Sequence, residues 1–535
     1  MFAALPSEVI NHILSWVGSG RDLLNFACVS RVCKALVIPN HLEYRVVRVA
    51  AGVDWQQDVN PGCVDIWKHL THRYDLTSNI RTLHFIMEYF VDDYHGFRIP
   101  TQLVEKLDEA QTPRPPELEE AEDDSQFRAI CAAIVKMEKL ETFMWDVGRE
   151  EAAISGENDL LLELVTQKST LRKLRLANEC AVRGLLESLK NPRHSIWRMS
   201  HLKALIIGYA WSFRTEVFEP FVVQDKYFAP WIQSLSSLTF LRINVEVFAA
   251  HSGKFHLPVL KGLSLVGYRA TSPASNDHMA TFLLNHPQIE EFSWTPWAAV
   301  QITLAPGCLP NVRRLTCPPE FLWALDSTIW GFGPFNTPRK IEELNLTGGC
   351  RSKTRLENLL SSRSFDHLSI KCLRVHSPVA ESFDPLFALP KNFRTLGIPH
   401  NQDFEWISQH QWVRLLSKFG NLEVFNGDGI WGKTFDDIPE ASDPEVVQVV
   451  QKFARRCPKL RQILCPVDLP DKSIQQQNQK LRIWREDARS HGGARIMAKW
   501  LGINDDEMKN WVVRWEFVES VLVDPFDTMD YDEMD

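Results

Sequence analysis

One stretch of the chain carries the residue types of a phosphate-binding loop. Residues 427–434 read Gly-Asp-Gly-Ile-Trp-Gly-Lys-Thr and match the pattern GxxxxGK[ST], and their first six residues also match GxGxxG. Such loops surround phosphates with backbone N–H groups and the N-terminus of a following helix. Here Asp436 and Asp437 follow closely, and Pro439 prevents a helix from continuing. We therefore interpret these glycines as a loop that leaves a strand, and keep a nucleotide-binding enzyme as the least favoured alternative.

The remaining residue types that support catalysis or metal binding do not form a recognised pattern. The sequence contains no GxSxG, HExxH or kinase motif, its 17 histidines are scattered, and its 11 cysteines include no CxxC pair. A zinc site needs closely spaced Cys or His ligands. We therefore expect a non-enzymatic protein with no catalytic residue, no metal and no cofactor.

The composition and charge of the chain bear on which kinds of partner it binds and on its cellular location. The 535 residues carry 59 Lys and Arg against 68 Asp and Glu, a net charge of −9. This balance argues against a nucleic-acid binder. No apolar run is long enough to cross a membrane, and the first residues do not resemble a secretory signal. An odd number of dispersed cysteines is typical of free thiols in a reducing compartment. These features predict a cytoplasmic or nuclear location, or both.

A recurring apolar-x-x-apolar-x-apolar pattern is the strongest long-range signal. Thirteen copies lie between residues 80 and 465, most of them 22 to 38 residues apart. That spacing accommodates one strand and one helix, and such alternation predicts parallel strands on one side and helices on the other. We expect an α/β fold, a curved solenoid with strands on the concave side and helices on the convex side. Apolar periodicity predicts helices over 160–165, 278–284, 412–419 and 446–457, and residues 42–49 are read as a first strand.

Residues 5–37 predict three short helices ahead of the repeats. Pro6 sits where a helix can begin, Gly18 and Gly20 end the first helix, and Ser30 can cap the third. Helices this short cannot bury all their apolar side chains among themselves. Some of these side chains must face a partner or the rest of the chain.

This segment resembles an F-box. The motifs that carry the resemblance are Leu5-Pro6-x-Glu8-Val9, Ile13-Leu14, Asp22-Leu23-Leu24 and Ala27-Cys28-Val29-Ser30-Arg31. The resemblance implies a module that binds the Skp-type adaptor of a cullin-based SCF ubiquitin ligase. The adaptor contacts it implies are Leu5, Pro6, Val9, Ile13, Leu14, Leu23, Leu24, Val29, Ser30 and Cys33. Cys33 stands where family members often carry Trp, which lowers the expected affinity for the adaptor.

The repeats resemble the leucine-rich repeats of fungal-type F-box proteins. That resemblance implies a non-catalytic substrate-receptor subunit, whose solenoid holds a protein substrate for ubiquitin transfer by other subunits. An F-box-containing scaffold or sensor outside any ligase is the main alternative, and a simple helical cap on the repeats is another reading of residues 5–37. Neither nucleic acid nor a membrane is an expected partner.

The middle x of each copy should point to the open concave face, because side chains alternate along a strand. Three of these thirteen positions are basic and none is acidic. We predict that the row recognises an acidic or phosphorylated protein segment; the alternative is a solvated face without a specific partner. The candidate substrate-binding residues are Arg175, Arg242, Asn345, Arg374 and Asn426.

Two segments interrupt or follow the repeats. Six of the eight residues from 117 to 124 are acidic and follow three prolines, which predicts a solvated loop. After Pro470 the repeat stops, and spaced Trp and Ile residues favour a helical cap. The expected parts are an F-box module (1–50), a linker or first repeat element (51–79), the solenoid (80–470) with an acidic insertion near 105–125, the helical C-terminal cap (471–523) and an acidic tail (524–535).

Overall fold

The computed structural model describes about half of the chain, as separate segments. They are residues 7–17, 20–38, 41, 46–51, 67, 70–87, 119–145, 158–177, 179–188, 191–208, 227–267, 273–296, 303–305, 307–318, 320–322, 324–325, 340–347, 370–375, 393–398, 409–427, 450, 452–467, 477–487 and 494–501. The described residues belong to two compact units. The first contains those up to Val247 together with Lys254–Val259, and the second contains Phe248–Gly253 and those from Leu260 onward.

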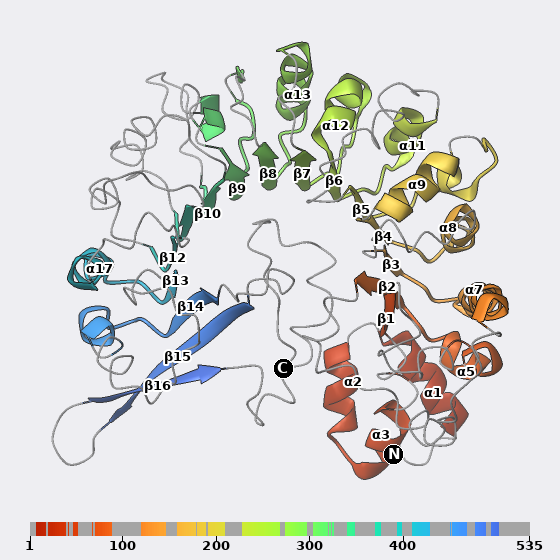
Figure 1. Cartoon of the computed structure of the whole chain (residues 1–535), viewed down its shortest axis with the longest axis horizontal. Coiled ribbons are helices and arrows are strands. Elements are labelled where there is room, and N and C mark those ends of the chain that lie inside the picture. Colours follow the sequence, from red (N-terminus) through yellow and green to blue (C-terminus); the bar gives the residue numbers. More distant parts are fainter. Residues whose placement is uncertain are drawn as a thin grey trace. The chain divides into compact units, whose positions relative to one another are not determined.

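The strands of the first unit form a parallel sheet in chain order (Figure 1). Every described neighbouring pair among them is parallel. A parallel pair requires a crossover between its strands, which is where the intervening helices lie. The strands are β1 (Val46–Ala51), β2 (Thr82–Met87), β3 (Thr142–Trp145), β4 (Lys173–Leu176), β5 (Ala204–Ile207) and β6 (Phe240–Asn244).

The second unit continues the same pattern and ends differently. Its parallel strands are β7 (Gly262–Gly267), β8 (Glu291–Pro296), β9 (Arg314–Cys317), β10 (Glu343–Leu346), β11 (Cys372–Val375), β12 (Thr395–Gly397), β13 (Val424–Asn426) and β14 (Gln462–Val467). All thirteen predicted repeat copies therefore contain a strand, β2 to β14, and the predicted first strand overlaps β1. Two antiparallel strands follow, β15 (Gln477–Asp487) and β16 (Ala494–Leu501).

Helices occupy the crossovers. In the first unit, Figure 1 shows α7, α8, α9 and α11 together on one side of the strands. Three of the predicted helices lie within or overlap α8, α13 and α17, and the fourth contains helical residues at 450 and 452–456. Among the described residues outside the N-terminal module, the helices and 3-10 helices (η) with both ends described are α5 (Tyr74–Thr77), α7 (Glu119–Lys136), α8 (Asn158–Thr166), α9 (Glu179–Ser188), η6 (Ser195–Arg198), α11 (Phe228–Ser234), α12 (Val245–His251), η8 (Ser252–Lys254), α13 (Pro273–Asn285) and α17 (Gln409–Leu416).

The apolar positions of the repeat form the core. Each described residue at an apolar position of the repeat pattern is at most 5% exposed, as at Ile341, Leu344 and Leu346. Burying one such side chain is worth about 1.5–3 kcal/mol. Because these positions recur from copy to copy, successive repeats within each unit add to one core.

A backbone contact recurs at the start of β3 to β6 and of β8 to β14. Two consecutive amides donate to one carbonyl oxygen of the preceding repeat, as Glu342 N (2.8 Å) and Glu343 N (3.0 Å) do to Arg313 O. The same pair of bonds recurs from Arg81 to Lys203 in the first unit and from Lys261 to Glu423 in the second. This contact fixes the register, so equivalent positions of successive repeats lie side by side.

The prediction of a solvated acidic loop is wrong for residues 119–124. These residues form the first turns of α7. Glu is a good helix former, and negative charge is favourable near a helix N-terminus, so an acidic run can begin a helix. The rest of the predicted insertion, residues 105–118, lies outside the described residues.

The prediction of a helical C-terminal cap is wrong for residues 477–487 and 494–501, which are β15 and β16. The apolar Leu481 and Ile483 alternate with Lys480 and Arg482, a period of two that fits a strand. The open edge of β14 offers unpaired backbone groups, and β15 pairs with them antiparallel. The other residues of 471–523, and the tail, lie outside the described residues.

The burial pattern predicts which leucines contribute most to the stability of the second unit. We expect Leu344→Ala, at a side chain that is 1% exposed, to lower the free energy of unfolding by about 2–5 kcal/mol. The matched change Leu284→Ala, at a side chain of α13 that is 41% exposed, should cost about 0.5 kcal/mol or less. Urea denaturation followed by tryptophan fluorescence measures both. Equal losses would contradict the assignment of the core.

Candidate functional site

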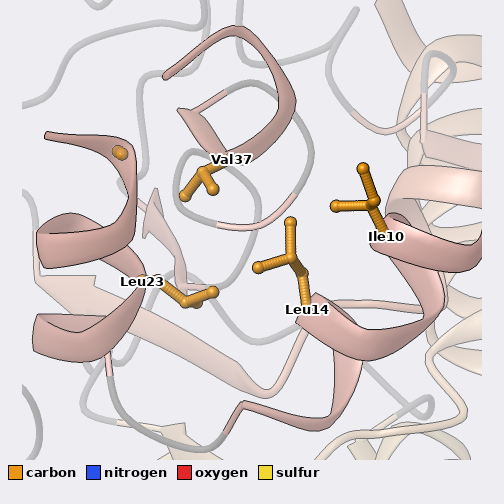
Figure 2. Close-up of a cluster of buried hydrophobic side chains, with 5 residues drawn as sticks. Ile10, Leu14, Leu23 and Val37 are labelled. Atoms are coloured by element: carbon orange, nitrogen blue, oxygen red, sulfur yellow. The ribbon is translucent and has the colours of Figure 1, made fainter. Parts of the chain in front are cut away.

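The N-terminal module has a small core of its own. It consists of α1 (Ser7–Trp16), α2 (Gly20–Ala27) and α3 (Arg31–Val37). Figure 2 shows the side chains of Leu14, Leu23 and Val37 directed toward one another, with Ile10 one turn before Leu14. Together with Ala27 they are at most 5% exposed. The three predicted helices are therefore present, and they pack around their own apolar cluster.

This core corrects the predicted role of two residues. Leu14 is 3% exposed and Leu23 is fully buried, so neither presents its side chain to a partner in this arrangement. Both lie on the inner faces of their helices, and they hold the module together. The spacing of apolar residues identified the helices but could not assign each residue to an inner or an outer face, because apolar residues occur on both.

A second set of apolar side chains faces outward. Val9 (43%), Ile13 (40%) and Val29 (72%) were predicted contacts and are exposed, and so is Val32 (61%), which the sequence analysis missed. Val9 and Ile13 lie one turn apart on α1. We call these four residues the outer apolar set. Among the described residues, they are four of the nine exposed large apolar side chains, although the module is a small part of the chain.

The other predicted contacts divide between structural roles and undescribed positions. The Ser30 side chain accepts a hydrogen bond from Cys33 N at 3.1 Å and so caps α3, as its position predicts. Cys33 itself is half-buried. Leu5, Pro6 and the side chain of Leu24 lie outside the described part of the structure.

The predicted row of middle positions is aligned by the strand register. In the first unit the aligned residues are His84, Met144, Arg175, Ile206 and Arg242. In the second unit they are Ser264, Ser293, Thr316, Asn345, Arg374, Gly397, Asn426 and Leu464. Two of the predicted basic residues thus belong to the first unit and one to the second.

The row is less open than predicted. Ser264, Ser293, Thr316 and Asn345 are at most 2% exposed, and the three arginines are half-buried. The side chain of Asn426 lies outside the described residues. Alternation along a strand predicts which way a side chain points, but the pattern does not report how much solvent reaches it.

Basic character on this face is concentrated in the first unit. Lys173 lies two residues before Arg175 on β4, so both side chains point to the same side of the sheet. Arg242 follows two strands later, with Ile206 between them in the register. The positions equivalent to Lys173 on β3, β5 and β6 are Thr142, Ala204 and Phe240. None of these positions is acidic.

The second unit carries a mixed charge network that the sequence analysis did not include. Glu291, Arg314 and Glu343 share one register position on β8, β9 and β10, two residues before the row. Arg314 Nη1 lies 2.5 Å from Glu291 Oε1, and Arg314 Nε lies 3.7 Å from Glu343 Oε1. Despite the nearby Arg314, burial raises the pKa of Glu291, and the carboxylates of Glu343 and Glu290 add to this effect.

Gly427, the only described residue of the phosphate-loop motif, has a structural reason to be glycine. A Cβ atom at this position would lie 2.5 Å from the carbonyl oxygen of Ile398 in the preceding repeat, which is a clash. The first glycine of the motif is therefore required by repeat packing. Residues 428–434 lie outside the described residues.

Glu163, His194 and Ser195 bring together the residue types of a hydrolase triad without its connections. His194 Nδ1 lies 3.2 Å from Glu163 Oε2, and the Ser195 hydroxyl donates to the backbone carbonyl of Glu163 at 3.0 Å. A nucleophilic serine would instead bond to the imidazole. Ser195 N also donates to Glu163 Oε2 at 2.8 Å, so the cluster ties α8 to η6.

No protein-family model and no curated protein matches the chain. Within the described segments, no group of three or more His, Cys, Asp or Glu side chains is placed to hold a metal ion. No helix among them has the length and apolar character needed to cross a membrane.

Two carboxylates of the second unit, Glu291 of the charge network and Glu342 of a separate ion pair with Lys371, are expected to show opposite pH effects. The raised pKa of Glu291 means that its stabilising contribution is complete below about pH 4.5 and is lost as the pH rises through the raised pKa. We expect the stability of Glu291→Gln relative to the parent protein to rise between pH 5 and pH 7.5. Lys371, whose Nζ lies 2.9 Å from Glu342 Oε2, lowers the pKa of Glu342.

The contribution of Glu342 is therefore present above about pH 4.5 and is lost as the pH falls through the lowered pKa. Glu342→Gln should be less stable than the parent at pH 7.5, with a smaller difference at low pH. Thermal unfolding at several pH values measures both variants. If the stability of both variants relative to the parent changed in the same direction with pH, the opposite pKa shifts assigned to Glu291 and Glu342 would be contradicted.

Proposed function

We propose that this chain is the substrate-receptor subunit of a cullin-based SCF ubiquitin ligase. In this proposal the three-helix module is an F-box that binds a Skp-type adaptor, and the leucine-rich repeats bind a protein substrate. The supporting observation is the outer apolar set, which stays exposed although the module has already formed a core. The chain itself performs no chemistry in this role, and it acts in the cytoplasm, the nucleus or both.

The outer apolar set supports binding to another protein over a purely structural cap. Val9, Ile13, Val29 and Val32 are between 40% and 72% exposed in the whole chain. A module that only capped the repeats would bury its outward apolar residues against them. Exposed apolar side chains on a module that already has a core favour contact with a partner, and apolar anchors dominate the energy of such contacts.

The mechanism of a receptor subunit is proximity. Fixing a substrate beside an activated ubiquitin replaces a bimolecular encounter with one at high effective concentration. A receptor therefore needs two separate surfaces held on one chain. The outer apolar set and the row of middle positions are distinct surfaces of this kind.

The charges on the row favour an acidic or phosphorylated substrate segment. Lys173 and Arg175 lie on β4 of the first unit, Arg242 lies two strands later on β6, and Arg374 lies on the row of the second unit. Arginine pairs with carboxylate and phosphate groups through two parallel hydrogen bonds. Half-buried arginines are also screened less by solvent than exposed ones.

One observation supports the main alternative, in which the chain is a scaffold or sensor outside any ligase. Cys33 occupies the position where family members often have Trp, and it is half-buried. A smaller side chain there removes an aromatic anchor from the module. The nucleotide-binding alternative is not favoured, because repeat packing accounts for Gly427.

The outer apolar set predicts which residues the adaptor needs. We expect Ile13→Glu combined with Val29→Glu to weaken binding of a purified Skp-type adaptor at least about tenfold, because each change places a charge in an apolar contact. Both side chains are exposed, so the melting temperature should change little. Val135→Glu, at a 56% exposed valine of α7, is the matched control and should bind normally. Unchanged adaptor binding by the double variant would exclude this surface.

The row predicts a charge requirement for the substrate. We expect the triple change of Arg175, Arg242 and Arg374 to Glu to remove most binding of a substrate recovered with the parent protein, since it replaces attraction by repulsion. The control makes the same change at the exposed Arg198, Arg455 and Arg456. Quantitative pull-down at two salt concentrations measures the effect. Retained binding by the row variant, or equal loss in the control, would contradict this substrate class.

A further inference from the structure

The turns that lead into β4, β5 and β6 carry a basic, hydroxyl-rich surface of the first unit. The described turn residues are 167–172, 199–203 and 235–239, and no acidic residue is among them. These turns supply three cations and, at the same position of each turn, one exposed serine. We call the six residues the basic edge, and they are Lys168, Arg172, Lys203, Ser169, Ser200 and Ser236.

The recurring backbone contact holds these turns side by side. Arg172 O accepts hydrogen bonds from Lys203 N at 2.7 Å and from Ala204 N at 3.1 Å. Lys203 O accepts them in turn from Thr239 N at 2.8 Å and from Phe240 N at 3.1 Å. We call the residue that supplies this carbonyl oxygen the strand-start residue. Adjacent strands are about 4.8 Å apart, so the strand-start residues Arg172 and Lys203 place two positive charges next to each other.

The acids near the basic edge lie at one end of it and have partners of their own. Glu141, the strand-start residue of the preceding repeat, forms an ion pair with Arg81 at 2.8 Å. Glu138 is the acid beside Lys168, and it accepts a hydrogen bond from the Tyr74 side chain. The positive charges of Arg172 and Lys203 are therefore not cancelled by these carboxylates.

Neutral backbone oxygens orient two of the cations. Lys168 Nζ donates to Val135 O at 2.8 Å, and Arg172 Nη1 donates to Ser169 O at 3.1 Å. Carbonyl oxygens position these groups without neutralising them. Burial lowers the pKa of Lys168, and burial together with the adjacent Arg172 lowers the pKa of His201, so His201 is neutral at pH 7. An anion at this edge would stabilise cations that are already in place.

The second unit does not repeat this composition, so repeat packing does not require it. There, strand-start residues of opposite charge pair with each other. Lys261 Nζ lies 3.2 Å from Glu290 Oε1, and Lys371 Nζ lies 2.9 Å from Glu342 Oε2. Three residues before the strand-start residue, where the first unit has its serines, three turns of the second unit have Pro287, Pro310 and Pro458. The basic edge is thus a feature of the first unit and not of the fold.

We propose that the basic edge binds a segment of the substrate that is rich in aspartate and glutamate. Its cations come from two successive turns, so they fit several carboxylates spaced along an extended chain better than one phosphate group. Carboxylate oxygens accept hydrogen bonds from arginine, lysine and serine hydroxyls alike. Lys173 follows Arg172 directly and opens β4, so the basic edge adjoins the basic part of the row. This inference rests on the proposed function and adds the turn residues to the substrate-binding surface.

A phage-displayed library of twelve-residue peptides with Asp or Glu at every second position, selected on the purified full chain, provides the probe. We expect the selected peptides to bind Arg172→Gln combined with Lys203→Gln at least about tenfold more weakly than the parent. The matched control is Arg394→Gln combined with Arg461→Gln, at exposed arginines directly before β12 strand residue Thr395 and before β14, and it should bind like the parent. If the double variant does not fold, Lys203→Gln alone, at an exposed side chain, should still weaken binding about threefold.

Two further variants separate the basic edge from the row and from a general effect of charge. Ser200→Ala combined with Ser236→Ala removes two exposed hydroxyls and no charge, and it should weaken binding about threefold. Arg175→Gln combined with Arg242→Gln removes charge from the row instead. Loss of binding in this row variant but not in the edge variant would place the peptides on the row and overturn the proposal. Equal loss in the edge variant and in the matched control would overturn it as well.

The inference can fail separately from the proposed function. If the library yields no peptide that binds, the basic edge is not a site for acidic segments, because its cations would accept many acidic sequences. Binding to the adaptor would still test the receptor proposal in that case. If peptides bind through the basic edge while the adaptor does not bind, the receptor proposal fails and the site for acidic segments remains.

Discussion

The structure depends on one backbone contact that is repeated along both units. At the start of β3 to β6 and of β8 to β14, two consecutive amides donate to the same carbonyl oxygen of the preceding repeat, as the amides of Lys371 (2.7 Å) and Cys372 (3.1 Å) do to Glu342 O. Each pair of bonds satisfies backbone groups that would otherwise be unpaired at the end of a crossover. It also fixes the register, because a slip by one residue would turn Leu373 out of the core and Arg374 into it.

Fixed register lets a short sequence pattern produce long surfaces. One surface is the apolar core, and the other is the row of middle positions with the charged positions beside it. Neighbouring repeats supply Glu291, Arg314 and Glu343 at one level of the sheet and Thr316, Asn345 and Arg374 at the next. The N-terminal module has a core of its own. Leu14 and Leu23 are buried in this core, and Ile13 and Val29 are exposed. The receptor proposal assigns the adaptor to the outer apolar set and the substrate to the row of middle positions.

The sequence predicts most of the repeat architecture because the apolar spacing and the strand register have the same physical origin. All thirteen copies contain strands at the predicted residues. Prediction from the sequence fails where the apolar spacing fits both a helix and a strand, as around Ile483 and Ile496. Only the edge of β14, which pairs with β15, decides in favour of strands. Burial of Asn345 and the inward orientation of Leu14 depend on contacts distant in the sequence, which no local pattern contains. The pairing of Arg314 with two carboxylates needs the register across three strands.

The central claim is that one chain joins a ligase adaptor to a substrate through two different surfaces. Affinity capture from cells under proteasome inhibition, with the full chain compared with a variant lacking residues 1–50, tests it most directly. The account predicts that the full chain captures the adaptor and a cullin, that the deletion variant captures neither, and that both retain a shared set of other proteins. Capture of no ligase subunit by the full chain would contradict the account.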